Sequence, residues 1–400
     1  MISGLPPVEG IYFSFVRANG ISHRLASTVK DLLQRDGGAS KAQAQGYPLV
    51  LFLHGFPESW YSWRHQLEFF RDRPYLAIAP DMRGYGSTSQ PESVEEYTHP
   101  VIARDVVGIS EALGYNRFIV VGHDWGSALA WNIALLCPER VIGVCGMSVP
   151  YSGTPKAGFL TMLQARHGKC LDKSVPRQER QKATYHYILH HCLPHASEEF
   201  DKNTREFLYR IYANRKGCQV DEGTPEHDVN DLMFPLSGDN ERDRTRSLDA
   251  TAAPGGWLRL PRPKTLPEWF NEDDLDYIVA EFQRAKFAGG LRWYQALDLN
   301  FYAMKMALIK KDGDYDDKIR SPSLFIVGEN DAVVKMYGGK KNILSRFKSS
   351  LPNMTRDPIF LQGCGHWIQQ ESPILVNASL LEFFEGLAKT ESGNGLTSRL

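Results

Sequence analysis

The stretch Phe118-Ile119-Val120-Val121-Gly122-His123-Asp124-Trp125-Gly126 joins a short apolar run to the start of a helical pattern. Consecutive apolar residues of this kind are typical of a strand buried on both faces of a parallel sheet. The last five residues, Gly122 to Gly126, have a glycine at each end. These glycines permit a tight strand-to-helix turn, which exposes the central side chain above the sheet edge. That side chain is Asp124, so the turn predicts a carboxylate nucleophile. An aspartate that only caps a helix would give the same local pattern.

Further apolar runs predict more buried strands, at residues 49–53, 75–79, 141–147, 323–327 and 358–361. Helical patterns lie between them, for example at 101–113, 127–136 and 375–387. Strands that alternate with helices predict a mostly parallel sheet with crossover helices. Near the start of the chain, Asn19-Gly20 separates segments 11–17 and 22–25 and predicts a hairpin.

The pattern changes after Pro150, because the chain is then helical and loop-rich as far as about residue 300. We therefore expect an α/β core formed by residues 1–150 and 301–390, a helical cap (lid) domain at 151–300, and a flexible tail at 391–400. Within the cap, residues 273–287 form an amphipathic pattern that Gly289 and Gly290 could end. The polar segment 34–45 is expected to be a surface loop, and the polar segment 215–267 an extended loop.

The overall composition limits the classes of function. The formal net charge is -1, which provides no field for nucleic acid or anionic lipid, and 42% hydrophobic residues allow a large core. No apolar run approaches the roughly 18 residues of a membrane helix, and the N-terminus lacks a secretory pattern. The six cysteines show no CxxC spacing, and His190-His191 is too isolated to indicate a metal site. No cofactor or metal is expected, and the oligomeric state stays open.

The C-terminal tripeptide Ser398-Arg399-Leu400 differs only by Arg for Lys from the Ser-Lys-Leu peroxisomal address. A tripeptide can also occur by chance. We therefore expect a cytoplasmic or peroxisomal protein.

Two further motifs supply partners for an Asp124 nucleophile. His54-Gly55-Phe56-Pro57 follows a predicted strand, so the backbone N–H groups of Phe56 and Trp125 are candidates for an oxyanion hole. Gly363-Cys364-Gly365-His366-Trp367 follows the last predicted strand and places His366 as the general base.

The acid that orients His366 should follow the preceding strand, within Gly328-Glu329-Asn330-Asp331. Asp331 is our choice, with Glu329 as the alternative. The order nucleophile, acid, histidine is the order along the chain in the α/β-hydrolase fold.

These motifs, together with Asp81-Met82-Arg83-Gly84-Tyr85-Gly86, resemble those of the soluble epoxide hydrolases of the α/β-hydrolase fold. The resemblance runs from about Ile11 to Leu387. It implies two lid tyrosines that hold and protonate the epoxide oxygen. Leu291-Arg292-Trp293-Tyr294 resembles one lid segment and indicates Tyr294; Tyr185-His186-Tyr187-Ile188-Leu189 resembles the other and indicates Tyr187, with Tyr185 as the alternative.

The expected reaction is hydrolysis of an epoxide to a vicinal diol through an ester on Asp124. Water activated by His366 and Asp331 would hydrolyse the ester. Phe56, Trp125 and the two lid tyrosines would also contact the substrate, which we expect to be lipophilic, such as a fatty-acid or aryl epoxide.

Two alternatives remain. A haloalkane dehalogenase uses the same aspartate nucleophile, but that family commonly has Asn at position 56 to hold halide, where this chain has Phe56. A non-catalytic hydrolase-fold protein that only binds a ligand usually lacks one member of the triad, and all three are present here.

Overall fold

The computed structural model describes residues 8–153, 157–167, 187–213, 262–309 and 316–393. The chain divides into two compact units, which we call the core unit (Met1–Thr154 with Ala303–Leu400) and the cap unit (Pro155–Tyr302). The alternative tyrosine Tyr185, most of the 215–267 segment and the C-terminal tripeptide lie outside the described residues.

The core unit is built on an eight-stranded sheet in the order β1-β2-β4-β3-β5-β6-β7-β8. Strands β1 and β2 pair antiparallel, as do β2 and β4, whereas all remaining pairs are parallel. This arrangement confirms the expected α/β-hydrolase architecture. The strands are β1 (Tyr12–Ala18), β2 (Ile21–Ser27), β3 (Leu49–Leu53), β4 (Leu76–Pro80), β5 (Phe118–His123), β6 (Val141–Met147), β7 (Ser323–Gly328) and β8 (Ile359–Leu361).

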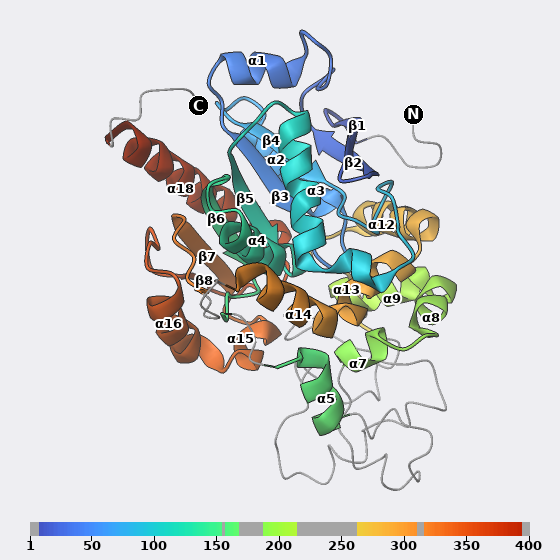
Figure 1. Ribbon diagram of the computed structural model, residues 1–400. Coiled ribbons are helices and arrows are strands. Elements are labelled where there is room, and N and C mark those ends of the chain that lie inside the picture. The colour runs from blue at the N-terminus through green and yellow to red at the C-terminus, as the bar shows by residue number, and fades with distance from the viewer. Residues whose placement is uncertain (1–7, 154–156, 168–186, 214–261, 310–315, 394–400) are drawn as a thin grey trace, which may run out of the picture. The chain divides into compact units, whose positions relative to one another are not determined.

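The predicted buried strands are buried because helices cover the sheet. Figure 1 shows α3 (His99–Ala112) and α4 (Trp125–Leu136) in front of it, and α4 packs on β5, β6 and α3. Another pair, α2 (Arg64–Phe70) and α18 (Pro373–Gly393), packs together against β4 and β6. Every residue of β3, β5 and β6 is buried, as the continuous apolar runs predict.

Shorter helices complete the core unit. They are α1 (Gly38–Ala44), the 3-10 helices at Trp60–Trp63 and Val94–Tyr97, α15 (Ala332–Met336), α16 (Gly339–Ser350) and α17 (Ile368–Glu371).

The cap unit is helical in the residues described. Its centre is aromatic: the rings of Phe200 and Phe207 stack at 4.0 Å, and Phe282 stacks on Phe287 at 4.5 Å. The helices are α5 (Phe159–His167), α7 (Tyr187–His191), α8 (Ala196–Lys202), α9 (Thr204–Ala213), α12 (Glu272–Ala285) and α13 (Ala288–Gln295), and α14 (Leu297–Leu308) runs across the boundary between the units.

Two local predictions were wrong. Residues 34–45 are not only loop, because α1 forms there and buries Ala39 and Ala42. The glycines at 289 and 290 do not end α12; they are buried within α13. Lys286, whose φ is 64°, ends α12 instead. In the part of the chain that the structure describes, no helix is long and apolar enough to cross a membrane.

A buried ion pair joins β2 to the loop after β4. Asp81 accepts from Arg24 Nε and from the Trp60 N–H at 3.1 Å, and neither charged side chain is exposed to solvent. Burial opposes ionisation of Asp81, yet the adjacent Arg24 guanidinium lowers the pKa of Asp81 below its ordinary value.

We expect Asp81→Asn to lower the free energy of unfolding by about 3–5 kcal/mol, because it leaves the buried Arg24 charge without its partner. Glu68→Gln is the matched control: Glu68 pairs with Arg71 at the surface, where such a pair contributes less than about 1 kcal/mol. Urea denaturation measures both variants. Similar losses in the two would contradict a structural role for the buried pair.

Candidate active site

The turn between β5 and α4 holds Asp124 in an unusual backbone conformation, with φ 53° and ψ -119°. Residues other than glycine rarely adopt positive φ, so neighbouring structure must impose it. The surroundings are too close for larger residues. A Cβ atom at Gly122 would lie 2.0 Å from the Gly126 oxygen, and one at Gly126 would lie 2.0 Å from the Leu53 oxygen. The two glycines therefore allow β3, β5 and α4 to meet where the Asp124 side chain emerges.

The two carboxylate oxygens of Asp124 have different partners. Oδ1 accepts the Phe56 N–H at 2.9 Å, and Oδ2 lies 3.5 Å from His366 Nε2. Parallel pairing of β3 with β5 brings the loop that follows β3 beside Asp124. Gly55 lies so close that a Cβ there would be 2.3 Å from Oδ1. Trp125, the other predicted oxyanion residue, is the first residue of α4.

The predicted acid, Asp331, lies beside His366. Its Oδ2 is 2.9 Å from His366 Nδ1, while its Oδ1 accepts the Val333 N–H at 2.9 Å as the N-cap of α15. Asp331 is buried, whereas the alternative, Glu329, is exposed. The geometry thus brings together Asp124, His366 and Asp331, the residues that the sequence predicts as nucleophile, general base and acid.

The three groups change one another's ionisation. Burial opposes the charged form of His366, but the Asp331 charge and hydrogen bonds to Asp124 and Asp331 raise the pKa of His366 well above its ordinary value. Burial would raise the pKa of Asp124, but the hydrogen bond and charge of His366 lower it. The resting arrangement is an imidazolium between two carboxylates.

The loop that carries His366 is held at several points. The Glu371 carboxylate accepts the N–H groups of Gly365 at 2.6 Å and Trp367 at 2.7 Å. The His366 carbonyl accepts the Ser148 hydroxyl at 2.8 Å and lies 2.7 Å from a ring nitrogen of His123. These contacts define the position of the backbone from which the imidazole extends.

Sequence reasoning missed Glu58, a fully buried carboxylate beneath the site. It accepts the Gly55 N–H at 2.7 Å, lies 2.9 Å from His123 Nδ1, and accepts Gln369 Nε2 at 2.9 Å. Burial opposes its charge, but His123 lowers the pKa of Glu58 below its ordinary value. Glu58 therefore connects the loop after β3, the Asp124 turn and the His366 region. The sequence signal was a glutamate directly after Phe56-Pro57.

The two predicted lid tyrosines lie together in the cap unit. Tyr187 begins α7 and Tyr294 lies in α13, and their ring centroids are 6.2 Å apart with an edge-to-face arrangement. His191 packs its ring edge-to-face against both, at 5.3 Å from Tyr187 and 4.6 Å from Tyr294.

Residues 48–170 match the family model described as the alpha/beta hydrolase fold. Epoxide hydrolase A of Mycobacterium tuberculosis is 33% identical over 87% of this chain and 93% of its own length. Epoxide hydrolase 3 of Siraitia grosvenorii is 31% identical over 84% and 91%. The crystal structure of epoxide hydrolase A from Mycobacterium thermoresistibile matches with a TM-score of 0.71 at 30% identity, over 94% of this chain and 98% of that one.

We expect NMR titration of the His366 ring to give a pKa well above 6.5 in the wild type and a lower value in Asp331→Asn. Because the pKa is raised on folding, protonation of His366 stabilises the fold below about pH 6.5, and this contribution is lost as pH rises through the folded pKa. Glu329→Gln is the matched control and should leave the titration unchanged. A larger shift in the Glu329 variant than in the Asp331 variant would exchange their assignments.

Proposed function

This chain belongs to the epoxide hydrolases of the α/β-hydrolase fold, and we propose that it converts epoxides to vicinal diols through a covalent ester on Asp124. One observation carries the proposal: the Asp124 carboxylate emerges from a positive-φ turn, with an N–H donor 2.9 Å from one oxygen and an imidazole nitrogen 3.5 Å from the other. A carboxylate held in this way suits attack on a strained ring that has no carbonyl group.

The first step forms the ester. Asp124 Oδ2 attacks an epoxide carbon, since Oδ1 is engaged by the Phe56 N–H, and the ring C–O bond breaks. The released oxygen takes a proton from Tyr187 or Tyr294. A tyrosine has an ordinary pKa near 10 and is therefore neutral and able to donate at neutral pH.

The second step hydrolyses the ester. Once the ester has formed, the protonated His366 releases its proton through solvent to the tyrosinate and becomes neutral. It then removes a proton from water, whose oxygen attacks Cγ of Asp124, and negative charge develops on Oδ1 beside the Phe56 and Trp125 N–H groups. The bond from Cγ to the ester oxygen Oδ2 then breaks, and His366 returns its proton to Oδ2, which leaves as the second hydroxyl of the diol. The new carboxyl group of Asp124 passes its proton to His366, which restores the carboxylate and the imidazolium of the resting site.

Formation of the ester prepares His366 for the second step. In the resting site, Asp124 contributes both a hydrogen bond and a charge that raise the pKa of His366. Esterification removes that negative charge, so the pKa of His366 falls when a base is needed, while Asp331 still orients the ring. The site therefore becomes basic only after the nucleophile has reacted.

Two features favour this reaction over the alternatives. A dehalogenase needs side-chain donors for halide, and position 56 contributes only a backbone N–H to Asp124. A protein that only binds ligands needs no matched triad, whereas here both His366 contacts to carboxylates are in place. Phe56 and Trp125, which we expect to contact the substrate, carry apolar side chains, and this supports lipophilic substrates.

A single turnover in ¹⁸O-water, with enzyme in excess over an aryl epoxide, tests the ester. We expect the first diol to contain no ¹⁸O, because its new oxygen comes from Asp124, and later turnovers to contain the label. Asp124→Ala should form no diol at all. Label in the first diol would show direct attack by water.

Two further substrates test the alternatives. Halide release from a chloroalkane without diol formation would favour a dehalogenase. Turnover restricted to small hydrophilic epoxides would contradict the lipophilic substrate class.

We expect Tyr294→Phe to slow ester formation by about 100-fold or more, the usual contribution of a positioned proton donor, and to change ester hydrolysis much less. Tyr187→Phe should act in the same direction. Tyr302→Phe is the matched control, because that ring is 62% exposed. Pre-steady-state traces separate the two steps. Equal slowing of both steps in the Tyr294 variant would remove it from the role of proton donor.

A further inference from the structure

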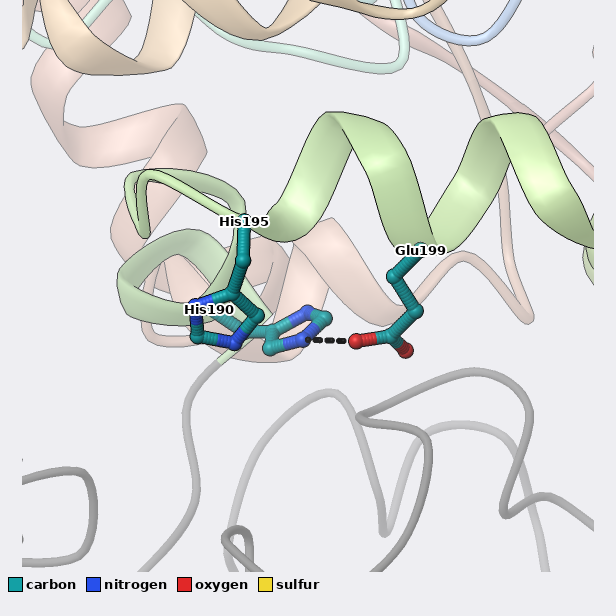
Figure 2. Close-up of side chains that lie close together, drawn as sticks. All are labelled: His190, His195 and Glu199. Atoms are coloured by element: carbon teal, nitrogen blue, oxygen red, sulfur yellow. Dashed lines mark hydrogen bonds and ion pairs between the residues drawn. The ribbon is translucent and has the colours of Figure 1, made fainter.

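Three potential metal ligands meet in the cap unit. His190 lies near the end of α7, His195 is the N-cap of α8, and Glu199 lies one turn further along α8. Figure 2 shows the side chains of His195 and Glu199 extending from α8 toward the His190 ring. One ligand atom from each residue lies within 4.8 Å of the other two.

The local sequence explains why these groups converge. Residues four apart at the start of a helix share one face, so His195 and Glu199 both point toward the preceding helix. The short connection after His191 turns the chain back, and His190 Nε2 lies 3.2 Å from Glu199 Oε2. His190 is buried and packs against the Phe200 ring at 5.6 Å, whereas His195 is exposed. The cluster thus has a rigid inner ligand and an outer ligand accessible from solvent.

We propose that His190, His195 and Glu199 bind one zinc ion, with water as a fourth ligand. Two imidazoles and a carboxylate form a donor set that zinc accepts, and such a set binds Zn²⁺ more tightly than Fe²⁺ or Mn²⁺. Ligand atoms about 2.0–2.2 Å from a tetrahedral zinc lie roughly 3.3 Å apart. His190 and Glu199 already have that spacing, so only the exposed His195 ring has to move inward.

The charge at the cluster is also suitable. Glu199 supplies one negative charge beside two imidazoles, so a divalent cation would be partly neutralised at a half-buried position. His190-His191 taken alone did not indicate a metal, because the other two ligands come from the next helix.

A zinc ion here would join the end of α7 to the start of α8. Because the free energy of metal binding adds to that of folding, a cross-link between α7 and α8 would stabilise both helices. Tyr187 begins the same helix and His191 contacts both tyrosine rings. The consequence for proton donation rests on the proposed function; zinc binding itself does not.

The test is zinc titration of the metal-free protein by calorimetry, with thermal unfolding as a second measurement. We expect one zinc per chain and a zinc-dependent rise in Tm, since a ligand that binds only the folded state stabilises it. Magnesium, which prefers oxygen ligands, should have no such effect.

Glu199→Gln should weaken zinc binding at least about tenfold and abolish the rise in Tm, and so should His195→Ala. Glu198→Gln is the matched control: Glu198 is the neighbouring residue on α8 and is exposed, pairing only at 3.8 Å with Lys202 among the ion pairs described. Zinc binding that is equal in the Glu199 and Glu198 variants would place the ion at other histidines or thiols and overturn the proposal. Failure of the wild type to bind zinc would overturn it as well. Neither result depends on epoxide turnover.

Discussion

The backbone at Asp124 is the constraint on which the rest of the site depends. A non-glycine residue at φ 53° is unfavourable, and it is maintained because β3, β5 and α4 approach one another through glycines that leave no room for a Cβ atom. The same close approach places the loop after β3 against the carboxylate, so the Phe56 N–H reaches Oδ1. One strained turn therefore positions both the Asp124 carboxylate and the N–H donor that faces it.

The position of the Asp124 carboxylate also determines the charge state of His366. His366 lies between two carboxylates, and each of them raises its pKa, so loss of either charge changes its basicity. In the proposed reaction, formation of the ester on Asp124 therefore lowers the pKa of His366 before the hydrolysis step. Hydrogen bonds from the protein interior keep these distances small: Glu371 holds the loop of His366, and Glu58 joins that region to the turn.

The cap unit is stabilised differently from the core unit. Its centre is a stack of aromatic rings rather than a sheet, and its short helices gain their stability from contacts with one another. A histidine packed against both tyrosines, and a second histidine directed toward α8, come from consecutive positions of one short helix. Contacts that stabilise this helix therefore also determine where its tyrosine lies.

The sequence by itself determined the strands, the turn at Asp124, and the chain order of nucleophile, acid and histidine, because apolar runs and glycine turns are local properties. The Asn19-Gly20 hairpin is another case, since both residues have the positive φ that such a turn needs. Composition was misleading for α1, a polar segment that becomes helical where Ala39 and Ala42 are buried by the rest of the core unit. Only the tertiary structure decided the contacts of Glu58, which reach residues 65 and 311 positions away, and the meeting of His190 with the face of α8. Such contacts depend on how separate elements pack, and no local pattern records that packing.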